Sequence, residues 1–211
     1  MSKKIDDLLL SLKNTSKSIE FSTKDFRELE KSIKNEEAFI GFLKKIDKRE
    51  LKNITMSLLK SCGIETYLTR VGDVNLRMAA LGKQHSSYVS FEIRHLLDLD
   101  SIRDTMENIA ILCSRYDTNI IDIKGAIVVK EVPNKRSDVW ELLINIKSEL
   151  DLNICIIPIY ALCKISIKGL KFDLNKFNSA SNQKSYRSSL EELIQEKINL
   201  SENSSLIESS K

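Results

Sequence analysis

The middle of the chain carries acidic side chains and an arginine at a spacing that suits metal-assisted chemistry. Glu92 and Arg94 lie on a predicted strand, Asp73 lies in a Gly-Asp turn before it, and Glu50 lies on an earlier predicted helix. Carboxylates on adjacent strands can hold Mg²⁺, which prefers oxygen ligands, activates water and neutralises a phosphate. A cation two residues beyond a carboxylate on a strand points to the same side, where it can stabilise developing charge. The pattern predicts phosphodiester hydrolysis.

Each of these residues also has a plainer interpretation. Asp73 is of a type that forms turns without any metal, and Glu50 lies on a helix rich in charged residues. Alternating Glu and Arg is common on the solvated face of a sheet. In an alternative register Asn75 stands at the metal position, where it would be a poorer ligand.

The hydrophobic pattern predicts three helices in residues 1–62. The first is an amphipathic stretch around Leu8, Leu9 and Leu12, and the second begins near Ser22 or Thr23. The third runs from about residue 36 to residue 62, keeps one apolar face, and ends at Gly63.

After Gly63 the pattern changes to strands. Alternation predicts strands over 65–71, 74–81 and 87–94, with a hairpin turn at 82–84, and it predicts that the third strand is half-buried. A helix from about residue 101, a buried strand at 125–129, a helix capped by Ser137 and a strand at 153–157 follow. The stripe of the second of these helices contains Trp140, Leu143, Ile144 and Leu150. Residues 161–167 suit either a strand or a helix.

The order ααα-βββ-α-β-α-β predicts an α/β fold with a mixed sheet between helices. We expect an N-terminal helical extension at 1–35, an α/β core at 36–174, and a polar C-terminal tail at 175–211 with one possible helix.

Residues 50–157 resemble the PD-(D/E)XK nuclease superfamily. The run Arg49-Glu50-Leu51, on a helix that ends at Gly63, is similar to the first helix of archaeal Holliday junction resolvases and Mrr-type enzymes. The resemblance implies a restriction-endonuclease-like fold, DNA as partner, catalytic Glu50, Asp73, Glu92 and Arg94, and Mg²⁺ or Mn²⁺ held by Asp73 and Glu92.

Two departures from that family leave two functions open. Arg94 replaces the expected lysine, and a guanidinium fork replaces an ammonium imperfectly. No proline precedes Asp73. The chain is expected to be either a metal-dependent DNA endonuclease or an inactive relative that binds nucleic acid or a protein without cleavage. A Glu92 side chain that faces the core helices would argue against cleavage.

Positive charge is concentrated locally, because the net charge of the 211 residues is only +3. A basic segment with interleaved aromatic residues could grip phosphates and stack on bases, or could be a solubilising tail. The candidate DNA-binding residues are Lys130, Lys135, Arg136, Lys164, Lys168, Lys171, Lys176, Lys184 and Arg187.

Other classes of function find little support in the sequence. We expect a cytoplasmic protein, because no apolar run approaches the roughly 20 residues of a membrane helix and the start does not resemble a signal peptide. P-loop, dinucleotide-binding and G-x-S-x-G motifs are missing. The four cysteines have apolar neighbours and are expected to act as small hydrophobes. The N-terminal helices could instead pair with a partner, or with a second copy in a homodimer.

Overall fold

The computed structural model describes residues 3–15, 36–69, 76–174, 188 and 192. Within these ranges the chain forms one five-stranded mixed sheet with the order β1-β2-β3-β4-β5. The strands are Glu65–Leu68 (β1), Ala80–Gln84 (β2), Ser87–Leu96 (β3), Ile123–Glu131 (β4) and Ile154–Pro158 (β5). The pairs β1–β2 and β2–β3 are antiparallel, whereas β3–β4 and β4–β5 are parallel. This confirms the α/β class and the mixed sheet.

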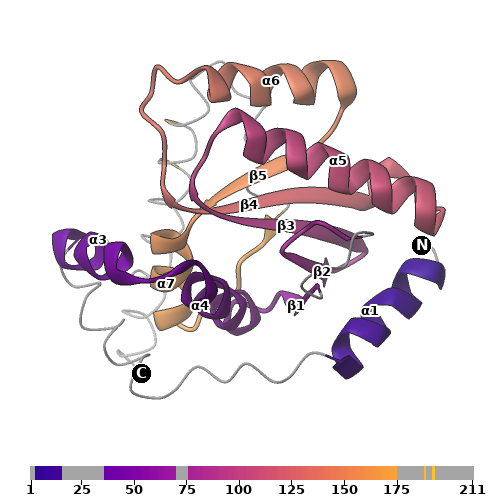
Figure 1. The fold of residues 1–211 in the computed structure, drawn as a ribbon, viewed down its shortest axis with the longest axis horizontal. Helices are drawn as coiled ribbons and strands as arrows, with labels where there is room; N and C mark the ends of the chain where they lie inside the picture. The colour runs from indigo at the N-terminus through magenta and orange to yellow at the C-terminus, as the bar shows by residue number, and fades with distance from the viewer. Residues whose placement is uncertain (1–2, 16–35, 70–75, 175–187, 189–191, 193–211) are drawn as a thin grey trace, which may run out of the picture.

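Helices cover both faces of this sheet (Figure 1). One layer contains α5 (Leu99–Tyr116) and α6 (Asp138–Leu150), and the other contains α4 (Lys48–Ser61) and α7 (Ile159–Ile167), with α3 (Glu36–Lys45) beside α4. The segment at 161–167, which the sequence left open, is therefore helical. No helix in the described ranges is long and apolar enough to cross a membrane.

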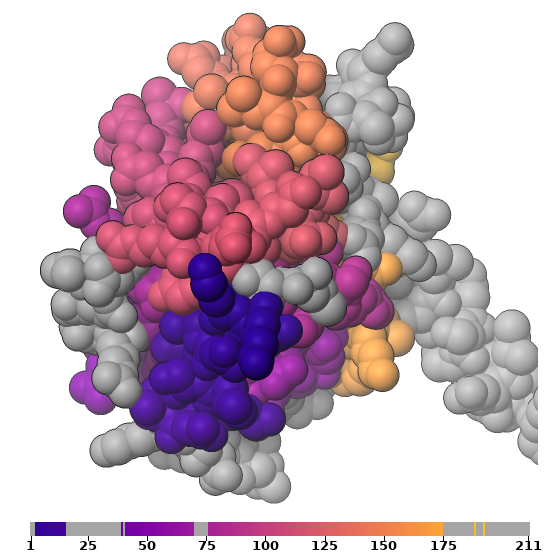
Figure 2. All heavy atoms as spheres, turned by 90° about the vertical axis from the view of Figure 1, so that its right-hand side faces the viewer, coloured from indigo at the N-terminus to yellow at the C-terminus, as the bar shows by residue number. Residues whose placement is uncertain are grey.

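Helix α1 (Lys3–Thr15) packs against β1 and α5. The apolar stripe of α1 is buried in the common core and consists of Ile5, Leu9 and Leu12. Figure 2 looks onto the side of the molecule where α1, in indigo, is packed. Lys83 on β2 binds Asp6 at 2.6 Å. The second predicted helix, near Ser22, lies outside the described residues.

The single helix predicted for residues 36–62 is wrong, because the chain breaks between α3 and α4. Asp47 caps α4: its carboxylate accepts the Glu50 N–H at 2.8 Å, while the Glu50 carboxylate accepts the Asp47 N–H at 3.2 Å. This reciprocal capping box starts a new helix although the apolar face continues through the break.

The hairpin prediction around Gly82 also needs correction. Gly82 lies inside β2, and the turn falls at His85, whose φ is 54°. A Cβ on Gly82 would lie 2.7 Å from the Thr66 methyl group and 2.8 Å from the Phe91 ring. The glycine therefore permits a close approach between neighbours on the sheet rather than a turn.

Two further details concern the ends of the core. Leu150, predicted to lie on the apolar stripe of α6, is 53% exposed, whereas Trp140 and Leu143 are buried. After α7 the chain returns to the core: Phe172 and Leu174 are each 1% exposed. The Gln84 side chain holds this return, since it donates to the Phe172 carbonyl and accepts the Leu174 N–H. The core thus extends at least to residue 174.

Candidate functional site

Strand β3 presents Glu92 and Arg94 to helix α5. The strand lies between β2 and β4, and α5 packs on both β3 and β4. A central strand with helices on both faces is buried on both sides, and Glu92 is only 5% exposed. The half-buried strand predicted from alternation is therefore wrong: the polar side of β3 faces a helix and not solvent.

The Glu92 carboxylate is occupied by two side chains. Asn108 on α5 donates to Oε1 at 2.9 Å, and the Arg94 guanidinium lies 3.2 Å from Oε2. Burial raises the pKa of Glu92 above its ordinary value, Asp104 raises it further, and Arg94 and Lys52 partly oppose them. This carboxyl thus holds its proton more tightly than an exposed glutamate does.

Arg94 bridges two acids. Besides Glu92 it binds the carboxylate of Asp104, one turn before Asn108 on α5. The guanidinium supplies the positive charge between two carboxylates, a role that a metal ion fills in metal-dependent sites. We call Glu92, Arg94, Asp104 and Asn108 the Glu92 cluster. Within the described ranges, Arg94 Nε and Asn108 Oδ1 are buried without a hydrogen-bond partner.

The segment that leads into β2 places a methionine beside this face. The Ser90 hydroxyl lies 3.7 Å from Met78 Sδ, and Ser90 is on the same side of β3 as Glu92. Ala79 and Ala80 both oppose Phe91: the Ala79 N–H donates to the Phe91 carbonyl, and Ala80 is the register partner of Phe91. A thioether and methyl groups are not ligands for a hard cation such as Mg²⁺.

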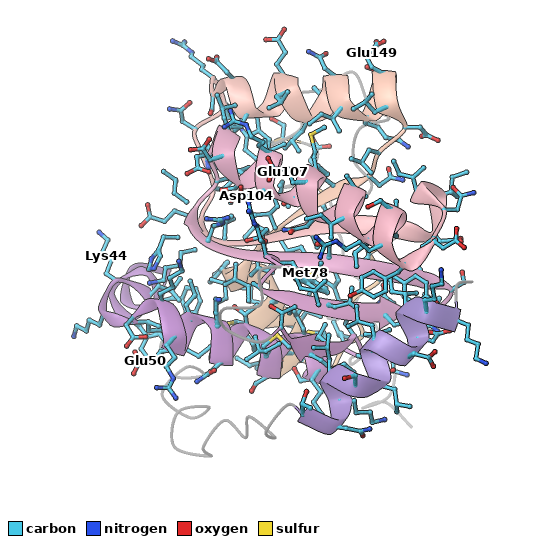
Figure 3. The ribbon with its side chains drawn as sticks, turned by 45° about the vertical axis from the view of Figure 1, so that its right-hand side comes forward. Lys44, Glu50, Met78, Asp104, Glu107 and Glu149 are labelled. Atoms are coloured by element: carbon cyan, nitrogen blue, oxygen red, sulfur yellow. The ribbon has the colours of Figure 1, made fainter. Side chains whose placement is uncertain are left out.

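Glu50 is not part of the Glu92 cluster. It lies at the exposed N-terminal end of α4, where its carboxylate completes the capping box with Asp47. Figure 3 shows Glu50 and Lys44 at one outer corner of the molecule, and Asp104 and Glu107 on α5 across the sheet. The position of Glu50 therefore suits a structural role at the start of α4.

The remaining predicted metal ligand, Asp73, and its alternative Asn75 lie outside the described residues. Within the described ranges, no three His, Cys, Asp or Glu side chains are grouped so that they could hold a metal ion. Glu92 brings one buried carboxylate that is already occupied by a cation and an amide. Of the two predicted metal ligands, the structure therefore describes only Glu92.

The predicted DNA-binding lysines and arginines are spread over different parts of the fold. The ammonium of Lys130 on β4 donates hydrogen bonds to the Leu43 carbonyl at 2.5 Å and the Ile46 carbonyl at 2.9 Å. These bonds attach the end of α3 to the sheet. Lys135 and Arg136 are exposed in the loop between β4 and α6.

The basic segment at 164–187 is only partly described. Lys164 lies over the Tyr160 ring at 4.5 Å, and Lys168 and Lys171 are exposed beyond α7. Lys176, Lys184 and Arg187 lie outside the described residues.

A third set of cations was missed by the sequence reasoning. Five of the nine residues at 44–52 are Lys or Arg, against two acids. These residues form the turn between α3 and α4, which we call the α3–α4 corner. Its cations are Lys44, Lys45, Lys48, Arg49 and Lys52. A count of charge along the chain would have found this group.

Comparison with known proteins leaves the family open. No protein-family model matches the chain, and no curated protein matches it.

Proposed function

We propose that this chain is a restriction-endonuclease-like protein that binds nucleic acid and does not cleave it. The fold part of the proposal is supported by the order of elements. A helix precedes a three-stranded antiparallel meander, and a helix then connects β3 to a parallel β4. This is the order on which the resemblance to PD-(D/E)XK nucleases rests.

The state of Glu92 is the main observation in support of a protein that does not cleave nucleic acid. A catalytic metal needs carboxylates that are ionised and free to coordinate it. Glu92 is buried, its pKa is raised, and both of its oxygens are engaged by Asn108 and Arg94. Among the described residues of the segment that leads into β2, the one in contact with Ser90 on this face is Met78.

Binding of nucleic acid is supported by exposed cations where the parallel strands end. Ligands of α/β proteins commonly bind beyond the carboxyl ends of parallel strands. The loop that follows β4 carries exposed Lys135 and Arg136. Positive side chains at such an edge suit phosphate groups. Of the acids in the Glu92 cluster, Glu92 is buried and Asp104 is paired with Arg94.

A binding assay and a cleavage assay on the same labelled DNA test the proposal. We expect the full-length protein to shift the DNA with Mg²⁺, Mn²⁺ or EDTA present, and the strands to remain intact. Metal-dependent cleavage that Glu92→Gln abolishes, while exposed Glu107→Gln leaves it unchanged, would establish the endonuclease instead. Failure to bind duplex, single-stranded and branched DNA would exclude the binding function.

A further inference from the structure

Four of the five cations of the α3–α4 corner face solvent, whereas the charge of the fifth, Lys52, also acts on the buried Glu92. Lys44, Lys45, Lys48 and Arg49 are exposed and Lys52 is half-buried. Among the ion pairs found in the described ranges, none involves any of the five. The two acids in the segment, Asp47 and Glu50, accept each other's backbone N–H groups. Residues 44–52 therefore carry a net charge of +3, and four of their five cations are exposed.

The corner is also fixed in place. Lys130 binds the Leu43 and Ile46 carbonyls from beneath, and the capping box fixes the start of α4. Buried Leu43, Ile46 and Leu51 attach both helices to the core. Cations on a fixed backbone lose less conformational entropy when they bind a ligand than cations on a flexible segment do.

The end of β3 lies close to the corner. The pKa of His95 is lowered by burial and, in addition, by the charges of Lys130 and Lys48. Because these charges act on His95, the three residues His95 on β3, Lys130 on β4 and Lys48 on α4 lie near one another. The N-terminal end of α4 adds the positive end of its helix dipole.

The spacing of the cations suits the backbone of a duplex. Lys48 and Lys52 are four residues apart on α4, so they share a face and are separated by about 6 Å along the axis. Phosphates of one DNA strand advance by about 3.4 Å per residue along the duplex axis. Since successive phosphates are also rotated around that axis, two lysines at this separation can contact neighbouring phosphates of one strand.

The described surface lacks a platform for unstacked bases. Proteins that bind single strands typically stack bases on exposed aromatic side chains. Every Phe, Tyr and Trp side chain within the described ranges is buried or half-buried. Charge without stacking favours contact with the phosphates of a duplex over recognition of single-stranded bases.

We infer that the α3–α4 corner is the principal surface by which this protein binds double-stranded DNA, through phosphate contacts that are independent of sequence. The inference rests on the proposed function and assigns the binding to residues 44–52. It places the contact on this fixed corner, so the Glu92 cluster takes no direct part in it.

Charge reversal at the corner tests the assignment. Lys48→Glu with Arg49→Glu should weaken binding of a labelled DNA duplex by at least about tenfold at low salt. It should also reduce the log–log salt slope by about 1.8, since two phosphate contacts are lost. Acids in the first turn of α4 favour the helix, so this variant should fold. Lys3→Glu with Lys60→Glu, two exposed sites away from the corner, changes the net charge equally and should lower affinity much less.

The outcomes separate this inference from the proposed function. If the wild-type protein binds DNA and the corner variant binds equally well, or if both variants lose the same affinity, the corner assignment is wrong while the binding function stands. Tighter binding of a single strand than of the duplex also overturns it. If the wild-type protein binds no DNA at all, the proposed function and the inference fail together.

Discussion

The Glu92 cluster and the α3–α4 corner are built from similar charged residues in opposite surroundings. In the cluster, Arg94 lies between the carboxylates of Glu92 and Asp104, beneath α5. At the corner, the acids cap a helix and leave the cations exposed. Charges that are paired and buried affect folding, whereas exposed cations affect what the surface attracts. The difference predicts that substitutions in the cluster change stability and those at the corner change binding.

The largest effect on stability is expected from Arg94→Ala. Removal of the guanidinium leaves the buried Glu92 carboxylate with only the Asn108 amide, and an uncompensated buried charge is strongly destabilising. Because the Arg94 side chain is 31% exposed, we expect a loss of about 2–4 kcal/mol rather than the full penalty. Urea denaturation measures it. Arg49→Ala at the corner is the matched control and should stay within about 0.5 kcal/mol of the wild type. Equal stability of the two variants would remove the contrast between the regions.

A smaller, pH-dependent effect is expected from Glu92→Gln. Burial raises the pKa of Glu92 in the folded state above its ordinary value of 4.5. Between these two pKa values the folded protein holds more protons than the unfolded chain, so the stabilisation is complete below pH 4.5 and is lost as the pH rises through the folded pKa.

Glu92→Gln should remove this loss, so that the stability of the variant changes less with pH than that of the wild type. The control is Glu107→Gln. Glu107 is an exposed residue of α5, and its substitution should keep the wild-type profile of stability against pH. Parallel profiles for wild type and Glu92→Gln, measured by thermal unfolding across this pH range, would show that Glu92 titrates as an ordinary carboxyl.

The smallest effect is expected at Glu50, where two substitutions separate a cap from a catalytic acid. Glutamine can also accept the Asp47 N–H and complete a capping box, whereas alanine cannot. Glu50→Ala should lower stability by about 0.5–1 kcal/mol, and Glu50→Gln should stay near the wild type. A catalytic carboxylate would give the opposite result, with any DNA cleavage abolished equally by both substitutions and stability unchanged.

Much of the fold could be predicted from the sequence because its strands and helices differ clearly in apolar period. The continuous run at 125–129 indicated a strand covered on both faces, and β4 is such a strand. The α3–α4 break was missed because the apolar face runs through it, and only the Asp47–Glu50 capping box marks it. Gly82 was assigned to a turn because glycine suits turns and close contacts alike.

The candidate site was harder to predict, because alternation along β3 separates two faces without showing what covers each. Glu92 and Arg94 were expected to lie together, and they do. Burial of Glu92 depends on α5, whose Asn108 and Asp104 meet this pair only in the folded chain. The excess of cations at the corner can be counted along the chain, whereas the capping role of its two acids is a property of the structure.

The state of the Glu92 carboxyl tests the central claim most directly. Carboxyl carbon NMR of full-length protein labelled at glutamate, assigned with Glu92→Gln, gives the titration of this residue and its response to Mg²⁺ and paramagnetic Mn²⁺. The account predicts a titration midpoint above 4.5, no shift with Mg²⁺, and no selective broadening with Mn²⁺. An ordinary midpoint, with a signal that Mg²⁺ moves and Mn²⁺ broadens, would show that Glu92 is a metal ligand and would contradict the account.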